Sequence, residues 1–171
     1  MDKAILDKIR DIPNFPKEGI LFRDITPLLA DGAAFAAVIN EFKAQCEGKG
    51  ITKVVAIEAR GFMFGSALAF ALGVGFVPVR KKGKLPYKTI SADFALEYGT
   101  DTLQMHEDAL SAADNVVVID DLLATGGTAQ AAGEMVGRLG AKISLYAFLC
   151  ELTALNGKEK LNAPYVSLIK F

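Results

Sequence analysis

The chain has 171 residues, which is enough for one domain with a sizeable hydrophobic core. Hydrophobic residues make up 51% of the sequence and charged residues 23%, a composition that is typical of globular proteins and excludes a disordered chain. The formal net charge of −1 argues against nucleic-acid binding, because proteins that hold phosphate backbones usually carry a basic surface.

The amino-terminal residues and the cysteines indicate a cytoplasmic protein with no membrane partner. Charged residues recur through positions 2–10, so we expect no signal peptide. No apolar run in the sequence approaches the ~20 residues needed to span a bilayer. Cys46 and Cys150 lie far apart without a pairing motif, and we expect both to be buried thiols in a reducing cytosol.

The first part of the chain alternates between helical and irregular patterns. Apolar residues recur at helical spacing in residues 2–10, which predicts a short amphipathic helix. Prolines and a glycine in residues 12–19 predict an irregular arm. Thr26 followed by Pro27 is typical of a helix start, with Thr26 as the N-cap, and Asp31 is expected to cap a longer helix that ends near residue 47.

The rest of the chain alternates strands and helices. We expect core strands at residues 53–57, 75–79, 115–120 and 143–150, helices at 61–72 and 128–139, and an antiparallel pair at 90–98 and 101–106. Continuous apolar strands that alternate with helices predict an α/β fold, in which a parallel sheet core is flanked by helices on both faces. Ligands of such folds bind beyond the carboxyl ends of the strands, which directs attention to residues 58–61, 80–86 and 120–128.

One of these segments has the features of a phosphate site. The apolar strand Val116–Ile119 is followed by Asp120 and Asp121, and then by a loop of small residues, Ala124–Thr128, that begins a helix. Small residues let backbone N–H groups point at an anion, and the helix N-terminus adds a favourable partial charge. Paired carboxylates beside such a loop suit vicinal hydroxyls, which donate hydrogen bonds. The segment therefore predicts binding of a ribose 5-phosphate. The alternative is a capped glycine turn with solvated acids; no Walker A sequence follows.

These residues, together with others along the chain, resemble the type I phosphoribosyltransferases, and among them the enzymes that act on adenine. The signature of the family is a hydrophobic run, two acids and a Thr-Gly-Gly-Thr loop. The matching blocks are Phe22–Leu28, Arg60–Phe62, Arg80–Pro86, Leu96–Gly99, Asp120–Thr128 and Glu151–Thr153. The resemblance extends from residue 12 to about residue 169.

The resemblance implies a purine salvage enzyme that transfers the 5-phosphoribosyl group from phosphoribosyl diphosphate to adenine, forming AMP and diphosphate. It implies a single phosphoribosyltransferase domain over residues 1–171, with residues 1–32 as a hood over the base site and residues 82–96 as a mobile lid. It also implies Mg²⁺, held through the substrate diphosphate and water rather than by protein ligands, and a homodimer.

The resemblance also assigns roles to individual residues. The phosphoribosyl group is expected to contact Asp120, Asp121, Ala124, Thr125, Gly126, Gly127 and Thr128. The diphosphate is expected to contact Arg60, Arg80, Lys81, Lys84 and Tyr98. Adenine is expected to lie between Leu21 and Leu122 and to be read by the backbone near Phe22 and Arg23. Glu97 is the expected catalytic acid or base, and a cis peptide bond is expected between Glu58 and Ala59.

Other interpretations remain open for some of these residues. Arg60 alone could also form a surface ion pair, and the basic residues after position 79 could form a solvated face. Phe22 could also be an aromatic residue of the core. Another purine base is an alternative substrate. A regulator that senses phosphoribosyl diphosphate would be expected to carry a nucleic-acid-binding domain and a basic face, and an orotate-type enzyme would be expected to have a different basic loop.

Overall fold

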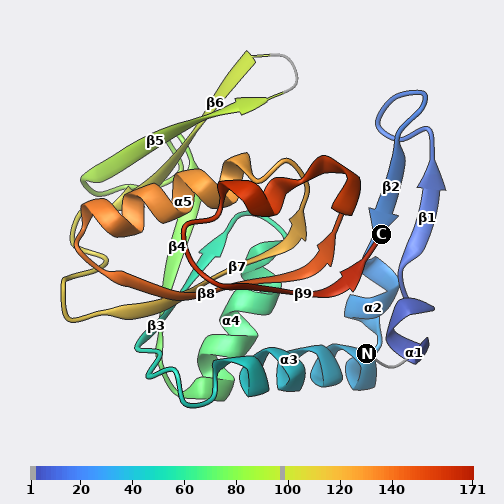
Figure 1. Cartoon of the computed structure of the whole chain (residues 1–171), viewed down its shortest axis with the longest axis horizontal. Helices are drawn as coiled ribbons and strands as arrows, with labels where there is room; N and C mark the ends of the chain where they lie inside the picture. The colour runs from blue at the N-terminus through green and yellow to red at the C-terminus, as the bar shows by residue number, and fades with distance from the viewer. Residues whose placement is uncertain (1–2, 97–98) are drawn as a thin grey trace. The chain divides into compact units, whose positions relative to one another are not determined.

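The computed structural model of the chain describes residues 3–96 and 99–171. Their contacts form two compact units, Met1–Glu41 and Phe42–Phe171. The first unit contains α1 (Lys3–Leu6), β1 (Arg10–Pro13), β2 (Leu21–Asp24), α2 (Thr26–Ala30) and most of α3 (Gly32–Cys46) (Figure 1).

The first unit contains a strand pair that the sequence did not predict. β1 and β2 pair in antiparallel fashion, with Ile12 opposite Phe22 and Pro13 opposite Leu21. The helix expected over residues 2–10 is therefore wrong beyond Leu6, and the irregular arm is wrong at its first two residues. The pairing of the two strands outweighs the helical spacing of the apolar residues. Pro13 is tolerated because it ends a strand of a two-stranded sheet, where its missing N–H removes few hydrogen bonds between strands.

Aspartates accept hydrogen bonds from the first residues of both α2 and α3. Asp24 accepts hydrogen bonds from the backbone N–H of Thr26 at 2.9 Å and from its hydroxyl at 2.8 Å. Thr26 was predicted to be the N-cap of α2, but the helix begins at Thr26 itself and Asp24 accepts the first N–H. Asp31 accepts hydrogen bonds from the N–H groups of Ala33 and Ala34, both at 3.1 Å, which confirms the predicted cap of α3.

The second unit is built on a sheet. Within the described residues this sheet has seven strands in the order β5-β6-β4-β3-β7-β8-β9. The strands are β3 (Lys53–Ile57), β4 (Gly75–Lys81), β5 (Thr89–Leu96), β6 (Gly99–His106), β7 (Asn115–Leu123), β8 (Lys142–Glu151) and β9 (Tyr165–Lys170). From β4 to β9 all neighbours are parallel, whereas β6 runs antiparallel to β4 and β5. The predicted parallel core and the predicted antiparallel pair are both present (Figure 1).

Two helices cover opposite faces of the sheet, which confirms the predicted α/β architecture. Strand side chains alternate between faces, so neighbours in sequence identify the two sides. Ala56 faces α4 (Gly61–Leu72), since a Cβ placed on Gly65 would lie 2.4 Å from the Ala56 Cβ. Its neighbours Val55 and Ile57 belong instead to the buried cluster that contains Met135 and other residues of α5 (Gly127–Arg138).

The predicted boundaries of the strands differ from the observed ones mainly at the carboxyl ends of the strands. β7 continues through both aspartates to Leu123, and β4 continues to Lys81. The sequence analysis did not predict β9, whose residues are mostly half-buried and lack a continuous apolar run. Two short 3₁₀ helices, η1 (Thr153–Leu155) and η2 (Gly157–Lys160), connect β8 to β9.

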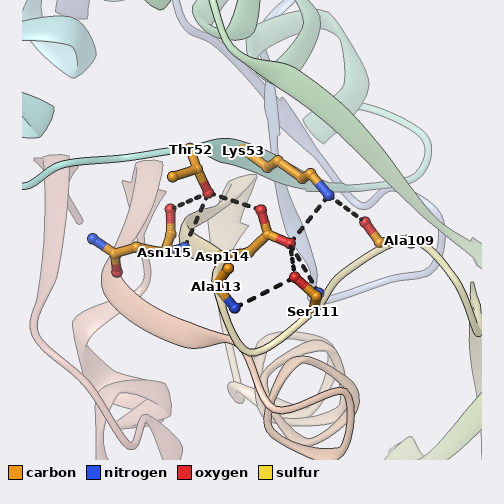
Figure 2. Close-up of polar contacts among 7 residues, drawn as sticks. All are labelled: Thr52, Lys53, Ala109, Ser111, Ala113, Asp114 and Asn115. Carbon is orange, nitrogen blue, oxygen red and sulfur yellow. Dashed lines mark hydrogen bonds and ion pairs between the residues drawn. The ribbon is translucent and has the colours of Figure 1, made fainter.

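A polar network joins β3 and β7 at their amino-terminal ends (Figure 2). The carboxylate of Asp114 accepts hydrogen bonds from the Thr52 hydroxyl at 3.0 Å and from the Lys53 ammonium at 3.2 Å. It also accepts bonds from the backbone N–H and the hydroxyl of Ser111, at 2.8 and 3.1 Å. The network ties the start of β3 to the turn that precedes β7, and so fixes the register in which these strands deliver their carboxyl ends.

The helices of residues 3–96 and 99–171 are too short or too polar to cross a membrane.

Candidate active site

A cavity of about 440 Å³ lies in the second unit where the carboxyl ends of β3 and β7 meet. The residues that line it are Glu58, Ala59, Arg60, Phe94, Asp120, Asp121, Leu122, Ala124, Thr125, Gly126 and Thr128. β3 ends at Ile57 and delivers the loop from Glu58 to Arg60, in which the Glu58–Ala59 peptide bond is cis, as predicted. The position agrees with the rule that open α/β sheets bind ligands beyond their strand ends.

Both predicted acids are buried in this cavity. Asp120 is 9% exposed and Asp121 is 5% exposed. The Asp120 Oδ1 accepts the backbone N–H of Asp121 at 2.9 Å, and the Asp121 Oδ2 lies 2.9 Å from the Arg60 Nε. Gly61 permits this close packing, because a Cβ on it would lie 2.8 Å from the Asp120 Oδ1.

The surroundings of the acid pair favour protonation. Burial raises the pKa of Asp120 well above its usual range, and the adjacent charge of Asp121 raises it further. Burial also raises the pKa of Asp121, against the opposing effect of the Arg60 guanidinium. Carboxylate oxygens accept more than one hydrogen bond each, so this pair can also accept hydroxyl donors from a ligand.

The loop after β7 presents a helix N-terminus to the same cavity. Gly126 has a φ of 78°, a left-handed conformation that glycine adopts without strain, and α5 begins at Gly127. No side chain of the described residues caps α5, and its first turn has no acidic residue. The N–H groups of that turn are therefore suited to an anion. Gly127 itself is buried and does not line the cavity.

The basic residues predicted to bind diphosphate are only partly in the cavity. Arg60 lines it. Arg80 donates from Nε to the Glu58 Oε2 at 2.8 Å and from Nη1 to the Lys84 carbonyl at 3.1 Å. The backbone N–H of Lys81 donates to the Glu58 Oε1 at 2.5 Å, while its ammonium lies 3.0 Å from the Asp101 Oδ2. Arg80, Lys81 and Lys84 do not line the cavity.

The segment predicted as a lid, residues 82–96, combines a turn with a strand. The turn follows β4, and the Gly83 N–H donates to the Gln104 side chain at 2.8 Å. From Thr89 the chain forms β5, which pairs with β6 throughout. Phe94 of β5 lines the cavity and is 9% exposed, so this strand supplies one wall. Movement of the segment remains a prediction.

The remaining predicted residues lie outside the cavity or beyond the described part of the chain. Glu97 and Tyr98 lie outside the described residues. Leu21, Phe22 and Arg23 belong to β2 of the first unit, where Arg23 pairs with Asp11 and the Phe22 ring packs edge-on against Phe15 at 5.1 Å. Leu122 lines the cavity of the second unit. A purine site formed by Leu21 and Leu122 together therefore stays a prediction.

Sequence reasoning assigned no role to three residues of the cavity wall, Glu58, Ala59 and Phe94. Glu58 and Ala59 stand in the strand exit loop that the sequence singled out, and their position in that loop was the available signal. Phe94 carried no comparable signal, because an aromatic residue on an expected strand is usually part of the core.

Comparison with known proteins assigns the chain to a family. The model of the phosphoribosyl transferase domain matches residues 27–170. Adenine phosphoribosyltransferase from Roseiflexus sp. (strain RS-1) is 52% identical over the full length of both chains. The crystal structure of adenine phosphoribosyltransferase from Thermoanaerobacter pseudethanolicus is 51% identical, covers 99% of each chain and superposes with a TM-score of 0.96. The structure of the Saccharomyces cerevisiae enzyme, 45% identical over 97% of each chain with a TM-score of 0.94, is a complex with adenine and an imino-altritol bisphosphate. The chain therefore belongs to the phosphoribosyltransferase family, and within it to the adenine phosphoribosyltransferases.

Proposed function

We propose that this chain transfers the 5-phosphoribosyl group of phosphoribosyl diphosphate to adenine, forming AMP and diphosphate in purine salvage. The observation that carries the proposal is the cavity at the ends of β3 and β7, in which a buried acid pair lies beside an uncapped helix N-terminus. Relatives about half identical over their full length carry this name, and the yeast relative was crystallised with adenine.

The phosphoribosyl group is bound by the end of β7 and the start of α5. Asp120 and Asp121 accept hydrogen bonds from the ribose hydroxyls, because both carboxylates line the cavity and carboxylate oxygens are acceptors. Backbone N–H groups of residues 124–128, with the hydroxyls of Thr125 and Thr128, hold the 5-phosphate. The carboxylates also lie near the developing positive charge of the sugar when diphosphate departs, and so favour that charge electrostatically.

The diphosphate is held by cations at the neighbouring strand ends. Arg60 lines the cavity and presents a planar fork of donors to the leaving group. Arg80 and Lys81 end β4, Lys84 follows it, and these residues approach the diphosphate when the segment 82–96 closes. The resemblance also assigns Tyr98 to the diphosphate. Closure excludes water from a glycosyl donor that water would otherwise hydrolyse.

The resemblance assigns the recognition of adenine to residues 1–32 and to Leu122. Leu21 is 46% exposed and Leu122 lines the cavity, so both offer apolar surface to a purine ring. The backbone near Phe22 and Arg23 reads the edge of the base, and a keto purine is rejected because an unpaired buried polar group costs ~1–3 kcal/mol. Glu97 moves the proton of the purine ring.

Mg²⁺ binds through the substrate rather than through a protein cage. In the described part of the chain, no group of three or more His, Cys, Asp or Glu side chains is placed to hold a metal ion. The donor set that fits is the diphosphate oxygens with water, which is how Mg²⁺ is usually held beside phosphates. When bound, the ion neutralises charge on the leaving diphosphate.

The active form is a homodimer in the cytosol. Phe70 of α4 is 91% exposed, and Met63, two helical turns earlier on the same face, is 37% exposed, as is Phe76 of β4. A second copy of the chain would cover this apolar surface. Cys46 and Cys150 are free and buried, which suits a reducing compartment.

A purine-selectivity assay tests the proposed function. Release of diphosphate, followed by a coupled assay with Mg²⁺, should depend on adenine and be far slower with hypoxanthine or guanine. A preference for guanine would overturn the base assignment. The double variant Asp120→Asn, Asp121→Asn should lose turnover while its circular dichroism stays native, and near-normal rates would refute the role of the acids.

A further inference from the structure

Gly157, the first residue of η2, lies in direct contact with the phosphate loop. A Cβ placed on Gly157 would lie 2.2 Å from the carbonyl oxygen of Ala124 and 2.8 Å from the backbone nitrogen of Gly126. Conversely, a Cβ on Gly126 would lie 2.3 Å from the carbonyl oxygen of Gly157. The two backbones therefore pack so closely that a side chain at either position would force one of them to shift.

The contact, rather than the backbone conformation, requires glycine at this position. Asn156 takes the left-handed conformation of the turn, with a φ of 50°, and Gly157 is not among the residues with positive φ. Gly157 is buried although its neighbours Asn156 and Lys158 are exposed. Space is thus what excludes a side chain.

Gly157 contacts the loop but is not part of the cavity wall. Ala124 and Gly126 line the cavity, whereas Gly157 does not. The segment between Ala124 and Gly126 is therefore enclosed by η2 on one side and by the cavity on the other. Its N–H groups and carbonyls cannot rotate outward without meeting the backbone of η2.

The turn that contains Gly157 is itself anchored to the sheet. The Leu152 N–H donates to the Leu123 carbonyl of β7 at 2.9 Å. Thr153 donates to the carbonyl of Phe171 from its N–H at 3.0 Å and from its hydroxyl at 2.7 Å. These bonds connect the start of η1, which leads into η2, both to the strand that carries the acid pair and to the last residue of the chain.

We propose that Gly157 is a positioning residue for the ribose 5-phosphate: its backbone supports the 124–126 loop from behind and holds the N–H groups at phosphate-binding geometry. This inference rests on the proposed function, because it assigns the loop to the 5-phosphate. A methyl group at position 157 must move from 2.2 Å to an ordinary contact distance of at least 3.4 Å from the Ala124 oxygen, so one backbone shifts by about 1 Å. A displacement of about 1 Å at a binding site can cost ~100-fold.

The variant Gly157→Ala tests the proposal against Gly137→Ala. Gly137 lies on the exposed face of α5, and a Cβ placed there meets nothing within 4 Å. We expect Gly157→Ala to raise the KM for phosphoribosyl diphosphate by ~10- to 100-fold and to leave the KM for adenine within about twofold, whereas Gly137→Ala changes neither. Calorimetry with ribose 5-phosphate should show the same loss of affinity.

A purely structural role would lower the unfolding midpoint and the active fraction but leave the KM for phosphoribosyl diphosphate of the folded enzyme unchanged, and that result would overturn the proposal. If Gly157→Ala does not fold, Thr153→Val is the milder variant: it removes the hydroxyl bond to Phe171, and it should raise the same KM by a smaller factor. An unchanged KM in that variant would overturn the proposal.

Wild-type controls distinguish this inference from the proposed function. If the wild-type chain binds ribose 5-phosphate but does not turn over adenine, the proposed function fails, and the calorimetric comparison still decides the role of Gly157. If the wild-type chain neither binds ribose 5-phosphate nor turns over adenine, both proposals are overturned; if it turns over adenine without binding ribose 5-phosphate, only the role of Gly157 in holding the 5-phosphate is overturned.

Discussion

Asp114 should stabilise the amino-terminal edge of the sheet without taking part in the proposed chemistry. Its carboxylate accepts hydrogen bonds from Thr52, Lys53 and Ser111 at distances of 2.8 to 3.2 Å (Figure 2). The side chain is only 11% exposed, so water competes little for these bonds. The substitution Asp114→Ala removes the acceptor of all of them and weakens the connection between β3 and the turn before β7.

The structure allows an estimate of the loss. A net contribution of ~1 kcal/mol per hydrogen bond, and ~1.5–3 kcal/mol for one to a charged group, sets the scale. Part of this stabilisation is retained, because Lys53 still donates to the Ala109 carbonyl at 2.9 Å and the Thr52 hydroxyl still donates to the Asn115 carbonyl at 3.3 Å. We expect the free energy of unfolding to fall by about 3 kcal/mol. At roughly 2–4 °C per kcal/mol, the midpoint should fall by about 6–12 °C.

Differential scanning calorimetry measures this loss, and steady-state kinetics at 25 °C measures its functional consequence. Asp108→Ala is the matched control, because Asp108 is an exposed aspartate of the same loop and should change stability by less than about 0.5 kcal/mol. The kcat and KM of folded Asp114→Ala should equal those of the wild type, since the cavity lies at the opposite edge. A midpoint within about 2 °C of the wild type, or kinetic loss in the folded variant, would refute the reasoning.

The same residue predicts a pH dependence. Burial tends to raise the pKa of Asp114, but hydrogen bonds from Ser111, Lys53 and Thr52 outweigh it and hold the pKa below its usual value of 3.8. A depressed carboxyl pKa stabilises the fold fully above the unfolded pKa of ~3.9, and this contribution is lost as the pH falls through the pKa of the folded state. The stability difference between the wild type and Asp114→Asn should therefore shrink below about pH 4.

Substitutions elsewhere in the second unit have separate expected outcomes. Glu58→Gln places an amide donor against the Arg80 Nε. In steady-state kinetics it should raise the KM for phosphoribosyl diphosphate by about tenfold, which corresponds to ~1.5 kcal/mol. An unchanged KM would show that Glu58 does not orient the basic loop. Gly65→Ala should lower the free energy of unfolding in urea titrations by ~1–3 kcal/mol, because its methyl group would lie 2.4 Å from the Ala56 Cβ. Phe70→Ser should convert a dimer to a monomer in sedimentation velocity, and a monomeric wild type would contradict the proposed dimer.

The sequence predicted the second unit better than the first because buried parallel strands carry a continuous apolar pattern. Residues 53–57 and 115–120 could be assigned from that pattern alone, and the acids after Ile119 marked the ligand edge. In the first unit the β1–β2 pair depends on contacts between strands that the local pattern does not encode. The sequence therefore predicted an irregular conformation for Ile12 and Pro13, although both pair with residues of β2.

The residues of the candidate site could be predicted where their residue type rarely occurs in that position without a function. They could not be predicted where their role depends on packing between distant segments. Two adjacent acids after an apolar strand are costly unless they bind something, so Asp120 and Asp121 were identifiable. Gly157 was not, because a glycine in a polar turn usually reflects backbone conformation, and its contact with Gly126 arises only when distant segments meet. The partnership of Glu58 with Arg80 likewise depends on the neighbouring positions of β3 and β4.

The substitution of aspartate by asparagine should have opposite effects on stability at the two ends of β7. At Asp114 the hydrogen bonds favour the charged carboxylate, so Asp114→Asn destabilises the fold at pH 7. At Asp120 burial and the charge of Asp121 disfavour the carboxylate and raise its pKa, so ionisation costs stability as the pH rises from the unfolded pKa of ~3.9 through the folded one. Asp120→Asn removes that cost and keeps an oxygen that can accept the Asp121 N–H.

Asp120→Asn should therefore unfold at a higher temperature than the wild type at pH 7, and this advantage should disappear below about pH 4, where the wild-type carboxyl is protonated in both states. Thermal denaturation across this pH range measures the effect, and turnover of the same variant should be strongly reduced. A variant less stable than the wild type at pH 7 would mean that the acid pair is already satisfied without ligand. A more stable and inactive variant would indicate that the protein keeps a destabilising charge because the ribose hydroxyls need it.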